Sequence, residues 1–134
     1  GNLGIAYAAL GEPRKAIEYH EQALRIHREV GDRRGEASRL GNLGIAYAAL
    51  GEPRKAIEHF EQALRIAREV GDRAGEATAS WNLGVVYREL GDLARAVELM
   101  QVRVDYDREV GHSDAEKDAA TVEELRKKMA EGQG

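Results

Sequence analysis

The side chains best suited to acid–base catalysis or metal binding are four histidines, His20, His27, His59 and His112. His20 and His27 lie seven residues apart, so they would share one side of a helix. No pair of these histidines has the short spacing of a metal motif such as HExxH, with a carboxylate close by. We therefore interpret them as partly buried or surface imidazoles, and we expect no metal site.

Other signatures of an enzyme are missing from the sequence. The stretch Gly1–Gly4 recurs within a predicted helix, so its glycines serve packing and do not form a phosphate-binding loop. No nucleophile–base set is apparent, and the absence of cysteine excludes disulfides and thiolate metal sites. The sequence therefore predicts no catalytic residue, no cofactor and no enzymatic activity.

An internal repeat of 40 residues organises the chain. Residues 1–40 and 41–80 are identical at 33 of 40 aligned positions, so they must share one structure. Residues 81–120 match the second copy at only 14 positions, but these include Asn82, Leu83 and Gly84. The chain starts within a repeat, which indicates a fragment of a longer array. We divide this single domain into a truncated first repeat (1–30), a second repeat (31–70), a third repeat (71–110) and a capping helix (113–131).

Each repeat is predicted to form two helices. In the central copy, apolar residues recur at spacings of three and four, which places them on one helical face. Gly51 accepts a positive φ at the end of the first helix, and Pro53 suits the first turn of the second. Asp72 and Asp92 are expected to cap the helices that follow them. Helices joined by so short a turn must be antiparallel, and stacking the hairpins buries their apolar faces.

These residues resemble the tetratricopeptide repeat family. The residues that match its pattern are Leu43, Gly44 and Tyr47 in the first helix and Ala56, Phe60 and Ala63 in the second. The family repeat is usually about 34 residues long, and the longer repeat here is most similar to that of spindle-orientation scaffolds, kinesin light chains and bacterial signalling ATPases. The resemblance covers roughly residues 1–111. It implies an all-α, right-handed α–α superhelix of antiparallel hairpins that binds other proteins.

The resemblance also implies a concave binding face, lined by the first helix of each repeat. The expected lining residues are Ile5, Ala8, Ala9, Ser38, Gly41, Ile45, Ala48, Ala49, Thr78, Trp81, Val85, Arg88 and Glu89. Relatives that clamp extended peptides often carry Asn where Ile5, Ile45 and Val85 stand, and Asn can hydrogen-bond a peptide backbone in two directions. With isoleucine and valine there, we expect a shallow apolar groove that suits an amphipathic helix.

Several of these residues allow two interpretations. Trp81, the only tryptophan, is either an anchor for the partner or packs between neighbouring repeats. Arg88 and Glu89 either set specificity at the rim or form a solvated charge pair. The asparagines Asn2, Asn42 and Asn82 recur beside Leu-Gly, and we favour a structural hydrogen bond between helices over a ligand contact.

The second helix of the third repeat departs from the pattern. Arg103 and Asp107 stand where Ala63 and Ala67 stood, and their spacing of four allows them to pair along the helix. A new apolar stripe appears at Leu99, Val102, Tyr106 and Val110. We expect this stripe to be covered by the last helix of the chain.

That last helix is expected at about Asp114–Glu131. Ser113 and Glu116 have the spacing of a capping box at its start. The helix has one apolar and one charged side, which suits a solenoid cap. The alternative is that it docks on a second chain.

Composition limits the kinds of partner. A net charge of −4 with 33% charged residues shows no basic excess for nucleic acid or an anionic membrane. No apolar run approaches the ~20 residues that a membrane span needs. With no signal peptide in view, we expect a cytoplasmic protein.

We therefore predict a protein–protein interaction module. It would hold a helical or extended peptide segment on its concave face, within a larger signalling or scaffold protein. The alternative is self-association into a homo-oligomer, by end-to-end stacking or exchange of a hairpin, because the repeats are alike enough to substitute for one another.

Overall fold

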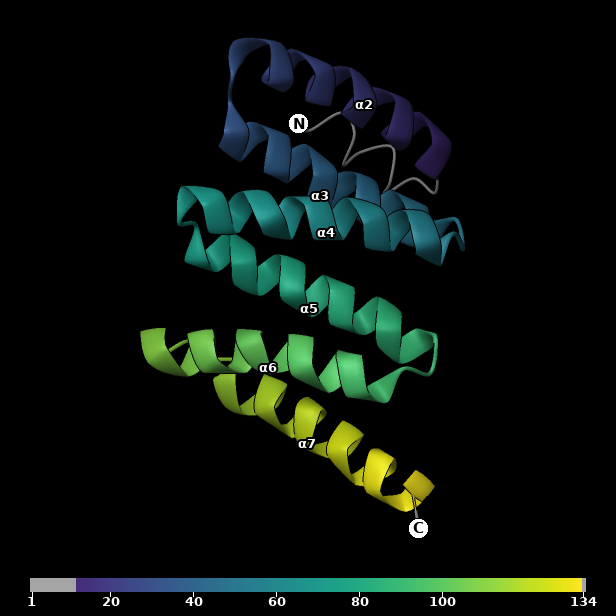
Figure 1. Ribbon diagram of the computed structural model, residues 1–134, viewed down its shortest axis with the longest axis vertical. Coiled ribbons are helices and arrows are strands. Elements are labelled where there is room, and N and C mark those ends of the chain that lie inside the picture. Colours follow the sequence, from purple (N-terminus) through teal and green to yellow (C-terminus); the bar gives the residue numbers. More distant parts are fainter. Residues whose placement is uncertain (1–11, 134) are drawn as a thin grey trace.

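The computed structural model describes residues 12–133, which form six helices and no strand. The helices are α2 (Pro13–Val30), α3 (Arg33–Ala49), α4 (Pro53–Val70), α5 (Arg73–Glu89), α6 (Leu93–Val110) and α7 (Ala115–Gln133). Each packs on the one before it, and together they form a single stack (Figure 1). The prediction of an all-α superhelix of helix hairpins is confirmed. Asn2, Ile5, Ala8 and Ala9 lie outside the described residues.

The turns between helices follow from local sequence. Gly71 ends α4 in a left-handed conformation with φ of 71°, which glycine adopts without steric strain. The carboxylate of Asp72 then accepts a hydrogen bond of 2.9 Å from the amide of Gly75, capping α5. Asp92 caps α6 in the same way, through the amide of Arg95 at 3.2 Å. These caps and the first-turn position of Pro53 agree with the sequence predictions.

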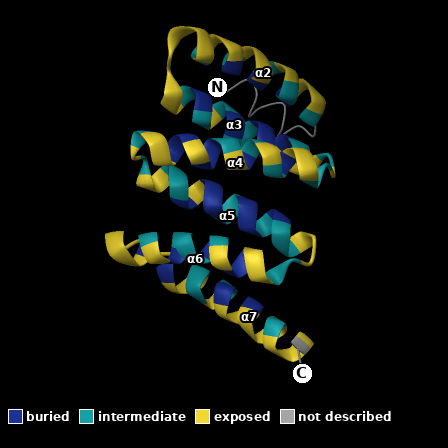
Figure 2. Ribbon diagram, viewed as in Figure 1, coloured by how far each residue is buried: buried dark blue, intermediate teal, exposed yellow. Residues whose placement is uncertain are grey.

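The central hairpin packs through a glycine. A Cβ atom on Gly44 would lie only 2.6 Å from the ring of Phe60, so the missing side chain lets α3 and α4 approach closely. Around this contact lies one apolar cluster that joins α2, α3, α4 and α5. It includes Leu40, Leu43 and Leu83, which are all buried. Figure 2 shows buried residues along the sides by which neighbouring helices meet.

A second apolar cluster joins α6 to α7. It contains Val97, Met100 and Val104 of α6, together with Val122 and Leu125 of α7. The prediction that α7 covers the stripe Leu99, Val102, Tyr106 and Val110 is therefore wrong for Leu99, Tyr106 and Val110. Leu99 packs on the first cluster and Tyr106 lies under Arg73, while Val110 remains 53% exposed. Helix α7 packs on a neighbouring side of α6, which carries Val97, Met100 and Val104. Tertiary packing determines which side of α6 is covered.

The start of α7 also differs from the prediction. No capping box joins Ser113 and Glu116 among the described hydrogen bonds. Instead, the amide of Asp114 donates to Nδ1 of His112 at 3.0 Å, and the carboxylate of Glu116 lies 3.6 Å from Nε of Arg108. This turn therefore uses an imidazole, whereas an aspartate caps α3, α5 and α6.

Candidate functional site

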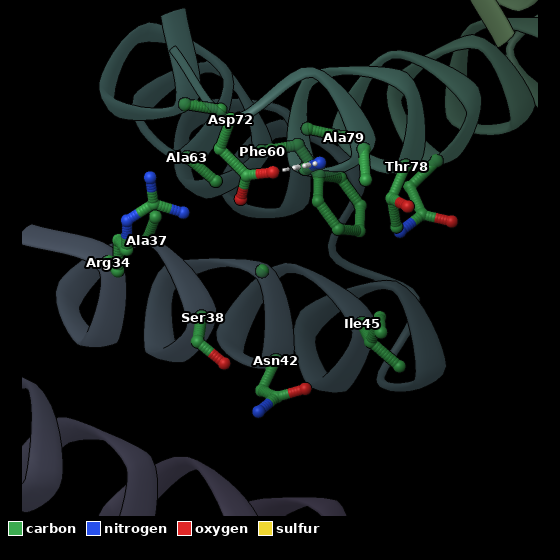
Figure 3. Close-up of a pocket in the computed structure, with 15 residues that line it drawn as sticks. Arg34, Ala37, Ser38, Asn42, Ile45, Phe60, Ala63, Asp72, Thr78 and Ala79 are labelled. Carbon is green, nitrogen blue, oxygen red and sulfur yellow. Dashed lines mark hydrogen bonds between the residues drawn. The ribbon is translucent and has the colours of Figure 1, made fainter. Parts of the chain in front are cut away.

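A groove of about 360 Å³ lies between α3 and α5, with α4 as its floor. Figure 3 shows Ser38, Asn42 and Ile45 along α3, and Thr78 across from them. The complete lining is Arg34, Ala37, Ser38, Gly41, Asn42, Ile45, Phe60, Ala63, Ala67, Asp72, Ala74, Gly75, Thr78, Ala79 and Asn82. Four residues predicted for the concave face thus line one groove: Ser38, Gly41, Ile45 and Thr78.

The groove exists because its walls and floor carry small side chains. Helices α3 and α5 are the first helices of successive repeats, and α4 separates them along the chain. Ala63 and Ala67 of α4 leave room between the two walls, and so do Gly41 on one wall and Ala79 on the other. A larger side chain at any of these positions would project into the space.

The character of the groove changes along its length. Arg34 lies near the start of α3 and is exposed, with no ion pair or hydrogen bond to any described residue. Asp72 lines the groove too, but its carboxylate already accepts the Gly75 amide. Near the other end of α3, Ile45 is an apolar side chain that is 50% exposed. The groove therefore offers an available cation on one part of α3 and an apolar contact on another.

Asn42 and Asn82 occupy equivalent positions on opposite walls of this groove. The structural hydrogen bond predicted for these asparagines is not formed, because neither side chain bonds to another described residue. Both side chains are partly exposed. Each amide can donate two hydrogen bonds and accept two, so both are available to a ligand.

The other predicted site residues lie elsewhere. Ala48 and Ala49 are exposed near the end of α3, outside the lining of this groove. Arg88 and Glu89 lie at the end of α5, and no described ion pair joins them. Ile5 and Ala8 fall outside the described residues.

Trp81 and Val85 face the cluster between α6 and α7. Both are partly buried and pack against it. The guanidinium carbon of Arg103 lies 6.0 Å from the centre of the Trp81 ring. Trp81 thus packs within its own repeat, against α6 and the last helix. Neither packing between neighbouring repeats nor a role as a partner anchor is shown, and both stay predictions.

The equivalent positions of the third repeat are filled by larger side chains. Three small residues that line the open groove have larger equivalents 40 residues later: Gly41 corresponds to Trp81, Ala63 to Arg103 and Ala67 to Asp107. Nε of Arg103 lies 3.4 Å from Oδ2 of Asp107, which confirms the predicted pair, and 3.8 Å from Oδ2 of Asp118. These side chains occupy the space that is open in the middle groove.

One hairpin earlier, on α2 and α3, the equivalent positions carry polar side chains. His20 occupies the position equivalent to Phe60, His27 that of Ala67 and Arg39 that of Ala79. Nη1 of Arg39 lies 3.3 Å from Nδ1 of His20, and burial lowers the pKa of His20 below its ordinary value of 6.5. His27 lies 3.0 Å from the carboxylate of Asp32. No group of three or more histidine and carboxylate side chains within residues 12–133 is placed to hold a metal ion.

Sequence reasoning missed part of the groove. Arg34 lies four residues before Ser38, so the same helical spacing, extended backwards, would have included it. Phe60, Ala63 and Ala67 are not among the predicted binding residues, although they form the floor of the groove. One sequence signal does mark the filled copy, because large residues replace the small groove residues there: Trp81, Arg103 and Asp107.

The repeats, the stacked hairpins and the groove between first helices agree with one sequence family. The tetratricopeptide repeat pattern matches residues 1–69 and 54–109. The chain belongs to the tetratricopeptide repeat family. Tetratricopeptide repeat domains generally mediate protein–protein interactions.

Solved tetratricopeptide structures share this fold. The TPR domain of Arabidopsis FLU has 25% sequence identity and a TM-score of 0.74, over 78% of this chain and 88% of that one. A Podosopora anserina protein with nearly identical TPR-like repeats has 21% identity and a TM-score of 0.79, over 92% of this chain and 62% of that one. BtubC from P. vanneervenii has 22% identity and a TM-score of 0.71, over 96% of this chain and 62% of that one. This tetratricopeptide repeat chain thus spans a little under two thirds of the last two.

No curated protein matches the chain. None of the helices described for this tetratricopeptide repeat chain has the length and apolar character to span a bilayer.

Proposed function

We propose that this tetratricopeptide repeat domain binds a helical or extended segment of a partner protein in the groove between α3 and α5. The observation that supports it most is the pair of unpartnered amides, Asn42 and Asn82, on facing walls of a groove lined mainly by small side chains. A buried amide without a partner is unfavourable. Both side chains therefore remain solvated until a ligand supplies donors and acceptors.

The lining suggests which side chains the partner segment carries. An apolar side chain would pack on Ile45, whose exposed surface the segment would remove from water. An acidic side chain would meet Arg34, the exposed guanidinium at the start of α3. The segment would therefore be amphipathic, with its apolar and acidic residues near opposite ends of α3.

A binding role is favoured over catalysis. The hydroxyl groups of the groove belong to Ser38 and Thr78, and no histidine or carboxylate among the described residues hydrogen-bonds to either. An activated nucleophile needs such a base. The net charge of −4 also favours a protein partner over nucleic acid or an anionic membrane.

The test is selection of a displayed peptide library on the wild-type domain, followed by titration of the selected peptides against single variants. Ile45→Glu places a charge on the apolar part of the groove, and we expect it to weaken binding by about tenfold or more, equal to ~1.4 kcal/mol. Asn42→Ala removes one amide from one wall, and we expect a loss of severalfold.

The matched control is Val110→Glu, which places the same charge on an apolar residue of α6 that is 53% exposed and outside the groove. We expect it to leave affinity within about twofold of wild type. Peptides that bind Ile45→Glu and wild type equally well would place the binding surface elsewhere.

Self-association is a second candidate, and one observation favours it. Ile26 and Val30 of α2 are well exposed, whereas Ile66, the equivalent of Ile26 in the next repeat, is buried. These two side chains give α2 an apolar surface that a second copy could cover. Light scattering over a concentration series tests this. A monomeric mass up to about 100 µM, unchanged by Ile26→Glu, would argue against a homo-oligomer.

A further inference from the structure

The groove between α3 and α5 contains an open space beside Gly41. A Cβ atom built on Gly41 would meet nothing within 4 Å. The floor carries the methyl side chains of Ala63 and Ala67, and the ring of Phe60 also lines the groove (Figure 3). The groove as a whole measures about 360 Å³. It therefore has room for a side chain from outside, and the surface that would meet this side chain is apolar.

The third repeat shows which side chain fills such a space. Its helices α5 and α6 have 17 and 18 residues, as α3 and α4 do, so equivalent residues occupy equivalent places along them. Trp81 of α5 corresponds to Gly41, and its ring packs against the apolar cluster of α6 and α7. An indole thus occupies the space that Gly41 leaves open in the preceding repeat.

An arginine also enters that space in the third repeat, but the middle groove has no group to hold one. Nε of Arg103 lies 3.4 Å from Asp107 and 3.8 Å from Asp118. The equivalents of these two aspartates in the middle groove are Ala67 and Thr78, which carry no charge. A guanidinium removed from water needs such a counter-charge, whereas an aromatic ring does not. The lining therefore favours a ring over a guanidinium.

The walls of the groove supply acceptors for a polar ring edge. Asn42 and Asn82 have side-chain amides that no other described residue bonds, and each amide oxygen can accept hydrogen bonds. The N–H of an indole or the O–H of a phenol needs such a partner when the ring is buried. Asp72 also lines the groove, but its carboxylate already accepts the amide of Gly75 at 2.9 Å. These acceptors favour tryptophan or tyrosine over phenylalanine.

We propose that the partner segment inserts one aromatic side chain, a tryptophan or a tyrosine, into the space beside Gly41. The inference rests on the proposed function, because it names the side chain that the bound segment contributes. The ring packs on Ala63 and Ala67 and meets the ring of Phe60, as Trp81 fills the equivalent space of the next repeat. Burial of the ring and its contact with a second ring stabilise the complex.

The first test uses small probes with the full wild-type chain. The N-acetyl amides of tryptophan, tyrosine, leucine and arginine are titrated separately, and NMR shifts of the backbone amides of Gly41 and Thr78 report on the groove. We expect the two aromatic probes to bind there about threefold or more tighter than the other two, because they alone gain a ring–ring contact. A leucine or arginine probe that binds the groove as tightly as the tryptophan probe would overturn the inference.

The second test fills the space from within. Gly41→Trp introduces the residue that the third repeat carries, so we expect a folded variant whose groove no longer responds to the tryptophan probe. Gly41→Ala adds only a methyl group and should keep the affinity within about twofold of wild type. Val110→Trp adds an indole on α6 outside the groove and should also leave the response unchanged. Urea unfolding checks that Gly41→Trp is folded, and if it is not, the probe series on wild type decides.

The selected peptides separate this inference from the proposed function. Replacing the aromatic residue of a peptide by leucine should weaken its binding by about threefold or more. Peptides that lose affinity for Ile45→Glu, yet bind folded Gly41→Trp as tightly as wild type, would overturn the inference and leave the proposed function standing. If no peptide responds to Ile45→Glu, the proposed function fails, and this inference fails with it.

Discussion

Replacing Gly44 by alanine tests how the central hairpin is packed. The added Cβ would lie 2.6 Å, 2.7 Å and 2.9 Å from Cε1, Cδ1 and Cζ of Phe60. Phe60 is 2% exposed and belongs to the main apolar cluster, so its ring has little room to move. The substitution must therefore displace the ring or separate α3 from α4.

Two effects of opposite sign decide the magnitude. Alanine favours the helix over glycine by about 0.5–1 kcal/mol. Overpacking in a filled core destabilises by about 1–3 kcal/mol. We expect a net loss of about 1 kcal/mol for Gly44→Ala, with several kcal/mol for Gly44→Leu because its longer side chain meets the same ring.

Gly41→Ala is the matched control on the same helix. A Cβ at Gly41 meets nothing within 4 Å, so only the helix preference remains. We expect this variant to be more stable than wild type by about 0.5–1 kcal/mol. The difference between the two alanine variants then isolates the clash with Phe60.

Urea unfolding followed by circular dichroism measures both variants. The difference between them should be about 1–3 kcal/mol, and Phe60→Leu in the Gly44→Ala background should recover part of it. If Gly44→Ala proves as stable as Gly41→Ala, the close approach of α3 and α4 described here is incorrect.

Three further predictions concern single side chains. Ser80 has a buried hydroxyl without a hydrogen-bond partner among the described residues. Ser80→Ala should therefore leave the stability measured by thermal unfolding unchanged, or raise it by up to about 1 kcal/mol. A clear loss of stability would mean that the hydroxyl has a partner. His20 has a pKa below 6.5 through burial, so its contribution to stability is fully present above that pH and is lost as the pH falls through the lowered value. His20→Phe, which restores the residue of the next repeat, should therefore reduce acid sensitivity between about pH 7 and pH 5, and an unchanged acid transition would contradict this. Glu109 pairs with Arg73 on an exposed edge, so Glu109→Gln should change the thermal midpoint little, and a large shift would mean that the pair does more than surface pairs usually do.

The sequence specified the helices well because their signals are local. Pro53 lies in the first turn of α4 as predicted, and Asp72 and Asp92 cap the helices that follow. Caps, turn glycines and apolar spacing act within a few residues, so they can be read without knowledge of the fold. Their recurrence at a period of 40 residues made the hairpin stack predictable as well.

The contacts of single side chains were less predictable. The side of α6 under α7 was misjudged, because residues one position apart on a helix differ by about 100° in direction. Val97 and Val104 face α7, whereas Tyr106 lies under Arg73. Periodicity shows that a face is apolar, but not which neighbour will cover it.

The sequence alone determined that this chain is a stack of helix hairpins, because short-range periodicity and repetition suffice for that. Only the tertiary structure decided where the open surface lies. The groove beside Asn42 and Asn82 is open since small residues from three helices meet there, while Trp81 and Arg103 fill the equivalent space in the next repeat. That outcome depends on side chains far apart in the chain, and so on how the helices pack.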